Sequence, residues 1–188
     1  MKMSEELREW HHRLSERDRM PPLIADVPWN TEFATWLTDA SDDVLFEQAN
    51  EDDTPAMRCM LYLWNGCLKD AHTIAQQLAT PLGSYLHGIM HRREPDYWNA
   101  KHWFRKAGEL PMFTELYEEF DSLRTAYLHD VPSTLKKLHA WNPLEFVDNC
   151  EKYEFDIATQ KHKFLQRIQQ IELQYVWDSM MKGETVSD

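Results

Sequence analysis

Pairs of a capping residue and a proline divide this chain of 188 residues into segments of helical length. Thr80-Pro81 and Asn142-Pro143 place a capping side chain directly before a proline at the first helical position, and Thr54-Pro55 repeats the arrangement. Asn65-Gly66 and Gly108 are typical of helix ends, because glycine adopts the left-handed conformation at little cost. Leu, Glu, Gln and Met are frequent between these signals and only 5 glycines occur, so the sequence favours helices over strands.

The spacing of apolar residues between the signals predicts helix after helix and no alternating strand. A first helix opens after Ser4, with His11 and His12 at its polar edge. A proline-rich connector over residues 21–30 follows, and Asn30 caps a short helix. Further helices are expected over residues 42–49, 56–64, 69–79, 81–93, 96–108, 111–128, 144–153 and 156–181, the last being the longest.

We therefore predict an all-α fold of stacked antiparallel helical hairpins with a long C-terminal helix. Residues 63–78 align on residues 92–107 at an offset of 29, matching helix, turn and helix. The second copy is similar to the second helix of a tetratricopeptide repeat, which implies a loosely tetratricopeptide-like stack. Residues 1–188 are expected to form a single domain that begins with an N-terminal helix and connector over residues 1–30. The last helix is expected to pack on its own domain or on a second subunit of a homodimer.

Charge and composition limit the classes of partner. The net charge is -12, so binding to nucleic acid or to an anionic membrane surface is not expected, because phosphate contacts need clustered Lys and Arg. The sequence has no run of about 18 apolar residues that could span a membrane, and its charged start does not resemble a secretory signal. Three cysteines without a CxxC pair indicate reduced thiols. We expect a soluble cytoplasmic protein.

Three histidines have the spacing of a metal site. His87 and His91 are four residues apart, so on one helix they share a face one turn apart. If the chain turns back at Thr80-Pro81, His72 lies at about the same level on the preceding helix. Three imidazoles on two neighbouring helices resemble the ligand set of a zinc or iron site, and manganese is a further candidate. The alternative is that these histidines cap helices or form structural hydrogen bonds.

The same region holds candidates for general acid-base catalysis. Asp96 is also placed to cap the helix that begins after it. Ser84 and Gly88 lie on the same side of the helix as the histidines, and their small side chains would admit a neighbouring helix, leave the floor of a pocket or face water. The candidates for a catalytic role are His87, His91, Glu94 and Asp96.

Basic side chains follow the histidines. Five Lys or Arg and two acids lie between His91 and Lys106, a local charge of +3. Arginine forks bind carboxylate or phosphate in a bidentate manner, so this cluster predicts a pocket for a small anion. The alternative is that Arg92 and Arg93 interact with the dipole at their helix end. The ligand-binding residues expected are Arg92, Arg93, Tyr97, Asn99, Lys101 and Arg105, although Tyr97 also shares an apolar face with Trp103 and Phe104 that predicts core positions.

Residues 87–105, HGIMHRREPDYWNAKHWFR, resemble the signature of a family of uncharacterised bacterial and fungal helical proteins, with the pattern HGxxHRRExDYxNxKxWFR. His102 stands where the family pattern has tyrosine. DAHTIAQ around His72 and WNPLEFVDNCE around Phe146 resemble the flanking segments, so the resemblance covers roughly residues 60–150. The resemblance implies a site in this region and no particular reaction.

These patterns support two functions of different class. In the first, a cytosolic protein binds a small anionic ligand in a His/Arg pocket, alone or together with a divalent metal, and the histidines could take part in catalysis. In the second, the protein is a helical module for protein-protein interaction. The same histidine, arginine and acidic residues then form a buried polar network that fixes how the helices pack.

Overall fold

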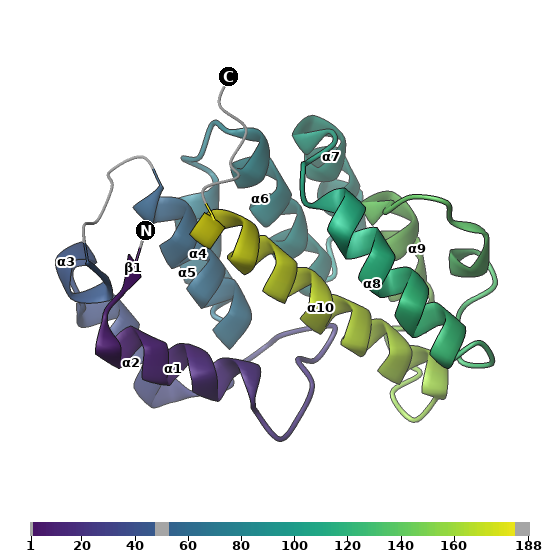
Figure 1. Cartoon of the computed structure of the whole chain (residues 1–188), viewed down its shortest axis with the longest axis horizontal. Helices are drawn as coiled ribbons and strands as arrows, with labels where there is room; N and C mark the ends of the chain where they lie inside the picture. Colours follow the sequence, from purple (N-terminus) through teal and green to yellow (C-terminus); the bar gives the residue numbers. More distant parts are fainter. Residues whose placement is uncertain (1, 48–52, 183–188) are drawn as a thin grey trace.

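Helices make up nearly all of the regular structure in the computed structural model of the chain, which describes residues 2–47 and 53–182 (Figure 1). The predicted all-α class is confirmed. In chain order the elements are β1 (Lys2–Met3), α1 (Glu5–Ser15), α2 (Thr31–Asp39), α3 (Asp42–Leu45), β2 (Phe46–Glu47), α4 (Thr54–Asn65), α5 (Leu68–Ala75), α6 (Pro81–Arg93), α7 (Tyr97–Ala107), α8 (Phe113–Ala126), a 3-10 turn η1 (Leu135–Lys137), α9 (Pro143–Tyr153) and α10 (Gln160–Lys182).

Several of the predicted capping signals act as expected. The hydroxyl of Thr80 accepts a hydrogen bond from the backbone N–H of Gly83 at 3.0 Å and starts α6. The side chain of Asn142 caps α9 in the same way, and that of Asn30 caps α2. Gly66 ends α4 with a φ of 83°, a left-handed conformation that residues with a side chain rarely adopt. Local side-chain chemistry thus sets these helix ends.

Two predictions near the N-terminus are wrong. The helix expected over residues 42–49 is a single turn that ends at Leu45, and the position expected for its end, Ala49, lies outside the described residues. Phe46 instead pairs with Met3 in an antiparallel ribbon of two short strands, although no strand was predicted. The carbonyl of Leu45 accepts from the backbone N–H of Ser4 at 3.0 Å. This long-range pairing buries Phe46 and overrides the local helical preference.

Three predicted helix boundaries also need correction. The last helix begins at Gln160 and not at residue 156, because the hydroxyl of Thr159 accepts from the N–H of His162 at 3.2 Å and so caps it. The preceding residues form a turn in which Ile157 is 70% exposed. The helix expected to run to residue 79 ends at Ala75, where the N–H of Leu78 donates to its carbonyl in a tight turn. Helix α4 begins at Thr54 itself, with Asp53 in the cap position.

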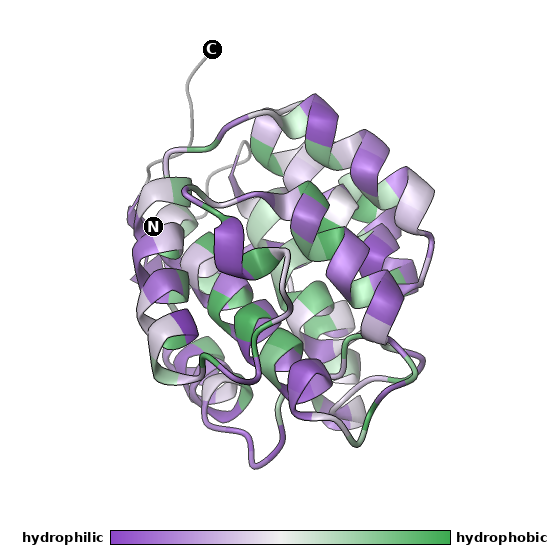
Figure 2. Cartoon of the chain, turned by 90° about the vertical axis from the view of Figure 1, so that its right-hand side faces the viewer, coloured by the Kyte–Doolittle hydropathy of each residue, from purple (hydrophilic) through white to green (hydrophobic). Residues whose placement is uncertain are grey.

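The helices from α4 to α7 pack in chain order: α4 on α5, α5 on α6 and α6 on α7, with α4 also on α6. Helix α10 crosses the front of this group diagonally in Figure 1 and contacts α4, α8 and α9. Its apolar face, which includes Leu165, Ile168 and Val176, is therefore buried within its own chain. The buried hydrophobic side chains form one cluster. In Figure 2 many of the outward-facing helical turns are purple, the colour of hydrophilic residues.

Helix α6 is buried on every side from Leu82 to Arg93, although its sequence has a polar face. Helix α7 comes close to that face at Gly88, where a Cβ atom would lie 2.8 Å from ring atoms of Phe104. Of the three alternatives for the small residues beside the histidines, the structure shows the close approach of a neighbouring helix. No described helix combines the length and the apolar character that crossing a membrane requires.

Candidate metal centre

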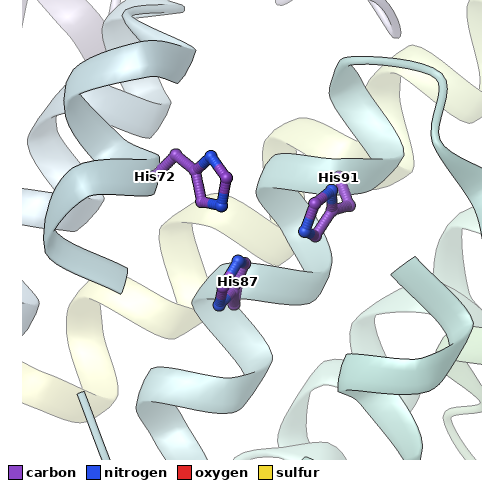
Figure 3. A group of neighbouring side chains, drawn as sticks. All are labelled: His72, His87 and His91. Carbon is purple, nitrogen blue, oxygen red and sulfur yellow. The ribbon is translucent and has the colours of Figure 1, made fainter. Parts of the chain in front are cut away.

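His72, His87 and His91 come together between α5 and α6. Each histidine offers one ring nitrogen, and the three nitrogens all lie within 4.8 Å of one another. Figure 3 shows the ring of His72 reaching from its helix toward the other two rings, which stand one turn apart on α6. The turn before Pro81 reverses the chain, so the spacing of the sequence places the three residues at one level.

His87 is the innermost of the three. The residue is 2% exposed, and neither ring nitrogen has a hydrogen-bond partner among the described residues. One face of its ring stacks on Trp103 of α7, with ring centroids 3.9 Å apart. Burial, followed by the neighbouring His91 and His72, lowers the pKa of His87 to about 4. The imidazole is therefore neutral at pH 7, which is the form that binds a metal.

His91 is held by carboxylates on its outer side. Its Nδ1 lies 2.9 Å from Oε1 of Glu94 and 3.9 Å from Oδ2 of Asp96. Since an ionised carboxylate only accepts hydrogen bonds, we assign the proton to Nδ1, which leaves the lone pair on Nε2. Burial lowers the pKa of His91, and the charge of Glu94 opposes this effect. A carboxylate behind a histidine in this way orients the ring and strengthens it as a metal ligand.

His72 closes the group from α5 and is only half-buried. Its ring centroid lies 4.9 Å from that of His87 and 5.3 Å from that of His91. In a tetrahedral zinc site the ligand nitrogens are about 3.4 Å apart, as follows from Zn–N distances of about 2.1 Å. The nitrogen separations in the structure, all within 4.8 Å, exceed that spacing by at most about 1.4 Å. Partial exposure gives His72 the freedom to move. Three imidazoles would leave a fourth coordination position of the metal open, on the solvent-exposed side of His72.

The other catalytic candidates serve structural contacts. Glu94 binds His91, as described above. Asp96 caps α7, because its side chain accepts from the backbone N–H of Asn99 at 3.2 Å and from the side-chain amide of the same residue at 2.6 Å. His91, Glu94 and Asp96 also form a second, more exposed group of ligand-type atoms. The four candidates thus occupy one continuous stretch around His91.

Arg92 points away from the histidines into the core. Its guanidinium is fully buried and makes two hydrogen bonds to Glu172 of α10, one of them 3.1 Å long. The hydroxyl of Tyr85 donates to the same carboxylate at 2.7 Å and accepts from the indole N–H of Trp141 at 3.0 Å. Burial is the largest influence on the pKa of Arg92 and lowers it, but the charge of Glu172, its hydrogen bond and smaller charge effects together raise the pKa. Arg92 is committed to an internal network of the kind predicted for a structural cluster.

The other predicted ligand-binding residues have separate surroundings. Arg93 is buried and donates to the carbonyl of Leu63, and burial together with the charge of Arg17 lowers its pKa to about 9. The structure does not gather all six around one opening. The other four predicted residues have partners of their own or face solvent: Tyr97 donates to Glu154, Asn99 donates to Asp96, Lys101 pairs with Asp148, and Arg105 is exposed.

The sequence analysis missed the roles of two residues in the site region. Glu172 was not singled out, although an acid between Ile168 and Val176 interrupts the apolar stripe of α10 and is a signal of a buried partner. Trp103 was predicted to be core, but it is half-buried and covers His87. Phe104 and Tyr97, predicted with it, are buried. Only the packing of α7 on α6 shows which aromatic residue faces the histidines.

No protein-family model, curated protein or solved structure matches this chain. The resemblance of residues 87–105 to a family of helical proteins therefore stays a prediction. The geometry of the described residues alone carries the functional argument.

Proposed function

We propose that this protein binds a divalent transition metal through His72, His87 and His91. The observation that carries the proposal is the state of His87, whose two ring nitrogens are buried without a hydrogen-bond partner in the described part of the chain. A buried polar group without a partner costs about 1–3 kcal/mol, so such groups usually have a use. Two further imidazole nitrogens lie within reach of the same point.

The donor set favours zinc over the other metals considered. Neutral imidazole suits zinc and iron, whereas manganese prefers carboxylate and water oxygens. The carboxylate of Glu94 behind His91 supplies the outer contact that zinc-binding histidines usually have. A zinc ion on three neutral ligands keeps its double positive charge, and its open position would take water or a small anion. This position would bind the small anionic ligand expected from the sequence, and with water bound there the site would be suited to hydrolysis.

We expect a near-stoichiometric amount of zinc in the untagged full-length chain. His87→Gln should lose nearly all of it, because the innermost ligand is gone. His102→Gln is the matched control, since His102 is an exposed histidine on α7 near the site. The measurement is elemental analysis of protein prepared without added metal or chelator, followed by reloading of chelator-treated protein with zinc, iron or manganese. Metal-free protein that does not reload, or equal zinc in both variants, would overturn the proposal.

A second candidate is the interaction module. Trp98 of α7 is 76% exposed and stacks on His102 at a centroid distance of 6.2 Å, and large exposed aromatic residues are frequent anchors of protein interfaces. In this function α4 to α7 would be consecutive tetratricopeptide-like hairpins, and the network around Arg92 would fix their packing. The cytoplasmic location that both functions assume is supported by three free, buried cysteines among the described residues. If both the wild type and His87→Gln are found to contain no metal, this second function is favoured.

A further inference from the structure

Two arginines meet at the C-terminal end of α4, away from the histidines. Arg93 of α6 donates through Nη1 to the carbonyl of Leu63. Arg17, which follows α1, donates through Nη1 to the next carbonyl, that of Trp64, at 3.4 Å. Arg93 is 1% exposed and Arg17 is partly buried. The two acceptors are consecutive carbonyls and the charge of Arg17 acts on Arg93, so the two guanidinium groups lie near each other.

Neither guanidinium has an acidic partner within the described ranges. No ion pair joins Arg17 or Arg93 to a carboxylate in residues 2–47 and 53–182. Glu172, which acts on Arg93 at longer range, is already bound by Arg92. The end of a helix offers roughly half a negative charge, whereas the two arginines carry two positive charges. The carbonyls therefore leave most of the charge uncompensated.

Several buried N–H groups at this place also lack a hydrogen-bond acceptor among the described atoms. They are Nε and Nη2 of Arg17 and Nε of Arg93. Nε and Nη2 form the edge of a guanidinium that binds two oxygens of one anion side by side. Unpaired buried charges and donors of this kind are costly, which points to a ligand.

We propose that Arg17 and Arg93 form an oxyanion site at the C-terminal end of α4 that takes a phosphate group. A phosphate at neutral pH carries a charge between about -1.5 and -2, which matches two guanidinium groups, whereas a carboxylate neutralises only one. Its oxygens can accept from the free edge of Arg17 and from Nε of Arg93. The phosphate can be free or part of a larger monoester. This site is separate from the metal centre and does not depend on it.

The test is thermal unfolding of the full-length, chelator-treated protein in increasing inorganic phosphate at constant ionic strength. We expect the Tm to rise and to saturate, because a ligand that binds only the folded state stabilises it. Acetate should give a smaller shift. Arg17→Met should weaken the apparent Kd for phosphate at least about tenfold, since it removes charge-assisted hydrogen bonds. Arg13→Met is the matched control, because Arg13 is an exposed arginine four residues before Arg17. This variant should bind phosphate like the wild type.

The outcomes separate this site from the metal centre. A phosphate shift that persists in His87→Gln and is lost in Arg17→Met supports the oxyanion site, whatever the metal content. A phosphate shift no larger than that of acetate, or one that Arg17→Met retains, overturns it. If Arg17→Met does not fold, Arg17→Lys serves instead, because lysine keeps the charge but lacks the bidentate edge. Phosphate affinity equal to wild type in Arg17→Lys would then count against the site.

Discussion

At the scale of single residues, two neighbouring arginines have opposite surroundings. Arg92 is bound by a carboxylate, whereas Arg93 donates to a carbonyl and has a second arginine near it. Consecutive residues on a helix point about 100° apart, so Arg92 reaches α10 while Arg93 reaches the end of α4. The ion pair of Arg92 and Glu172 is fully desolvated, and breaking such a pair costs far more than removing both members.

Arg92→Met should therefore lower the free energy of unfolding by about 3–5 kcal/mol, because Glu172 keeps a buried charge without its partner. The double variant Arg92→Met/Glu172→Gln should recover most of that loss, since glutamine is neutral and still accepts from Tyr85. Urea denaturation of the single and double variants measures both values. A loss below about 1 kcal/mol in Arg92→Met would show that this pair contributes little.

At the scale of elements, the close packing of α6 and α7 shapes the metal centre. Gly88 allows α7 to approach, and that approach places Trp103 against the ring of His87. Gly88 and Phe104 form this contact, and Phe104 is 2% exposed. A side chain at residue 88 would separate the two helices at the level of the histidines, because protein interiors leave little free volume.

Gly88→Ala should lower the free energy of unfolding by about 1–3 kcal/mol, as expected for an overpacked core. It should also weaken zinc binding, since displacement of α7 removes Trp103 from His87. Phe104→Leu in the same chain makes room for the new methyl group and should restore part of both properties. The measurements are urea denaturation and a zinc titration. Full stability and full zinc affinity in Gly88→Ala would show that the helices are not in close contact.

At the scale of the whole molecule, α1 is fixed to the helical group by aromatic packing. His11 of α1 stacks on Trp177 of α10 at a centroid distance of 4.9 Å and meets the edge of Trp64 of α4 at 5.2 Å. Its Nε2 is buried without a partner in the described residues. His11 and His12 were both predicted to lie at the polar edge of the first helix. His11 is instead packed against aromatic rings, whereas His12 is exposed as predicted. Burial lowers the pKa of His11, although Asp178 opposes this effect.

The lowered pKa predicts acid sensitivity at this junction. A histidine that is harder to protonate in the folded state leaves stability unaffected above its unfolded pKa of about 6.5 and reduces it as the pH falls below that value. His11→Phe keeps the aromatic stack but cannot be protonated. It should therefore show a smaller loss of stability between neutral and acidic pH than the wild type, whereas His12→Gln should not differ. Urea denaturation across this pH range, with metal-free protein, decides between these outcomes.

The sequence by itself determined where most helices begin and end. Thr80, Asn142 and Gly66 act through contacts with backbone groups a few residues away, so their effect can be read without the fold. The sequence also predicted that the three histidines lie at the same height on their two helices. His87 and His91 are four residues apart on one helix, and the turn before Pro81 brings His72 beside them. These are short-range properties, and they are the part of the candidate site that was predicted.

Only the tertiary structure decided which polar side chains are buried and what they face. Glu172 is 80 residues from its partner Arg92, and Arg17, which follows α1, and Arg93 of α6 both reach carbonyls at the end of α4. The ribbon of Met3 and Phe46 likewise replaces a predicted helix through a contact across the chain. Electrostatic pairing and burial depend on neighbours in space, and a sequence specifies those neighbours only through the packing of all its helices together.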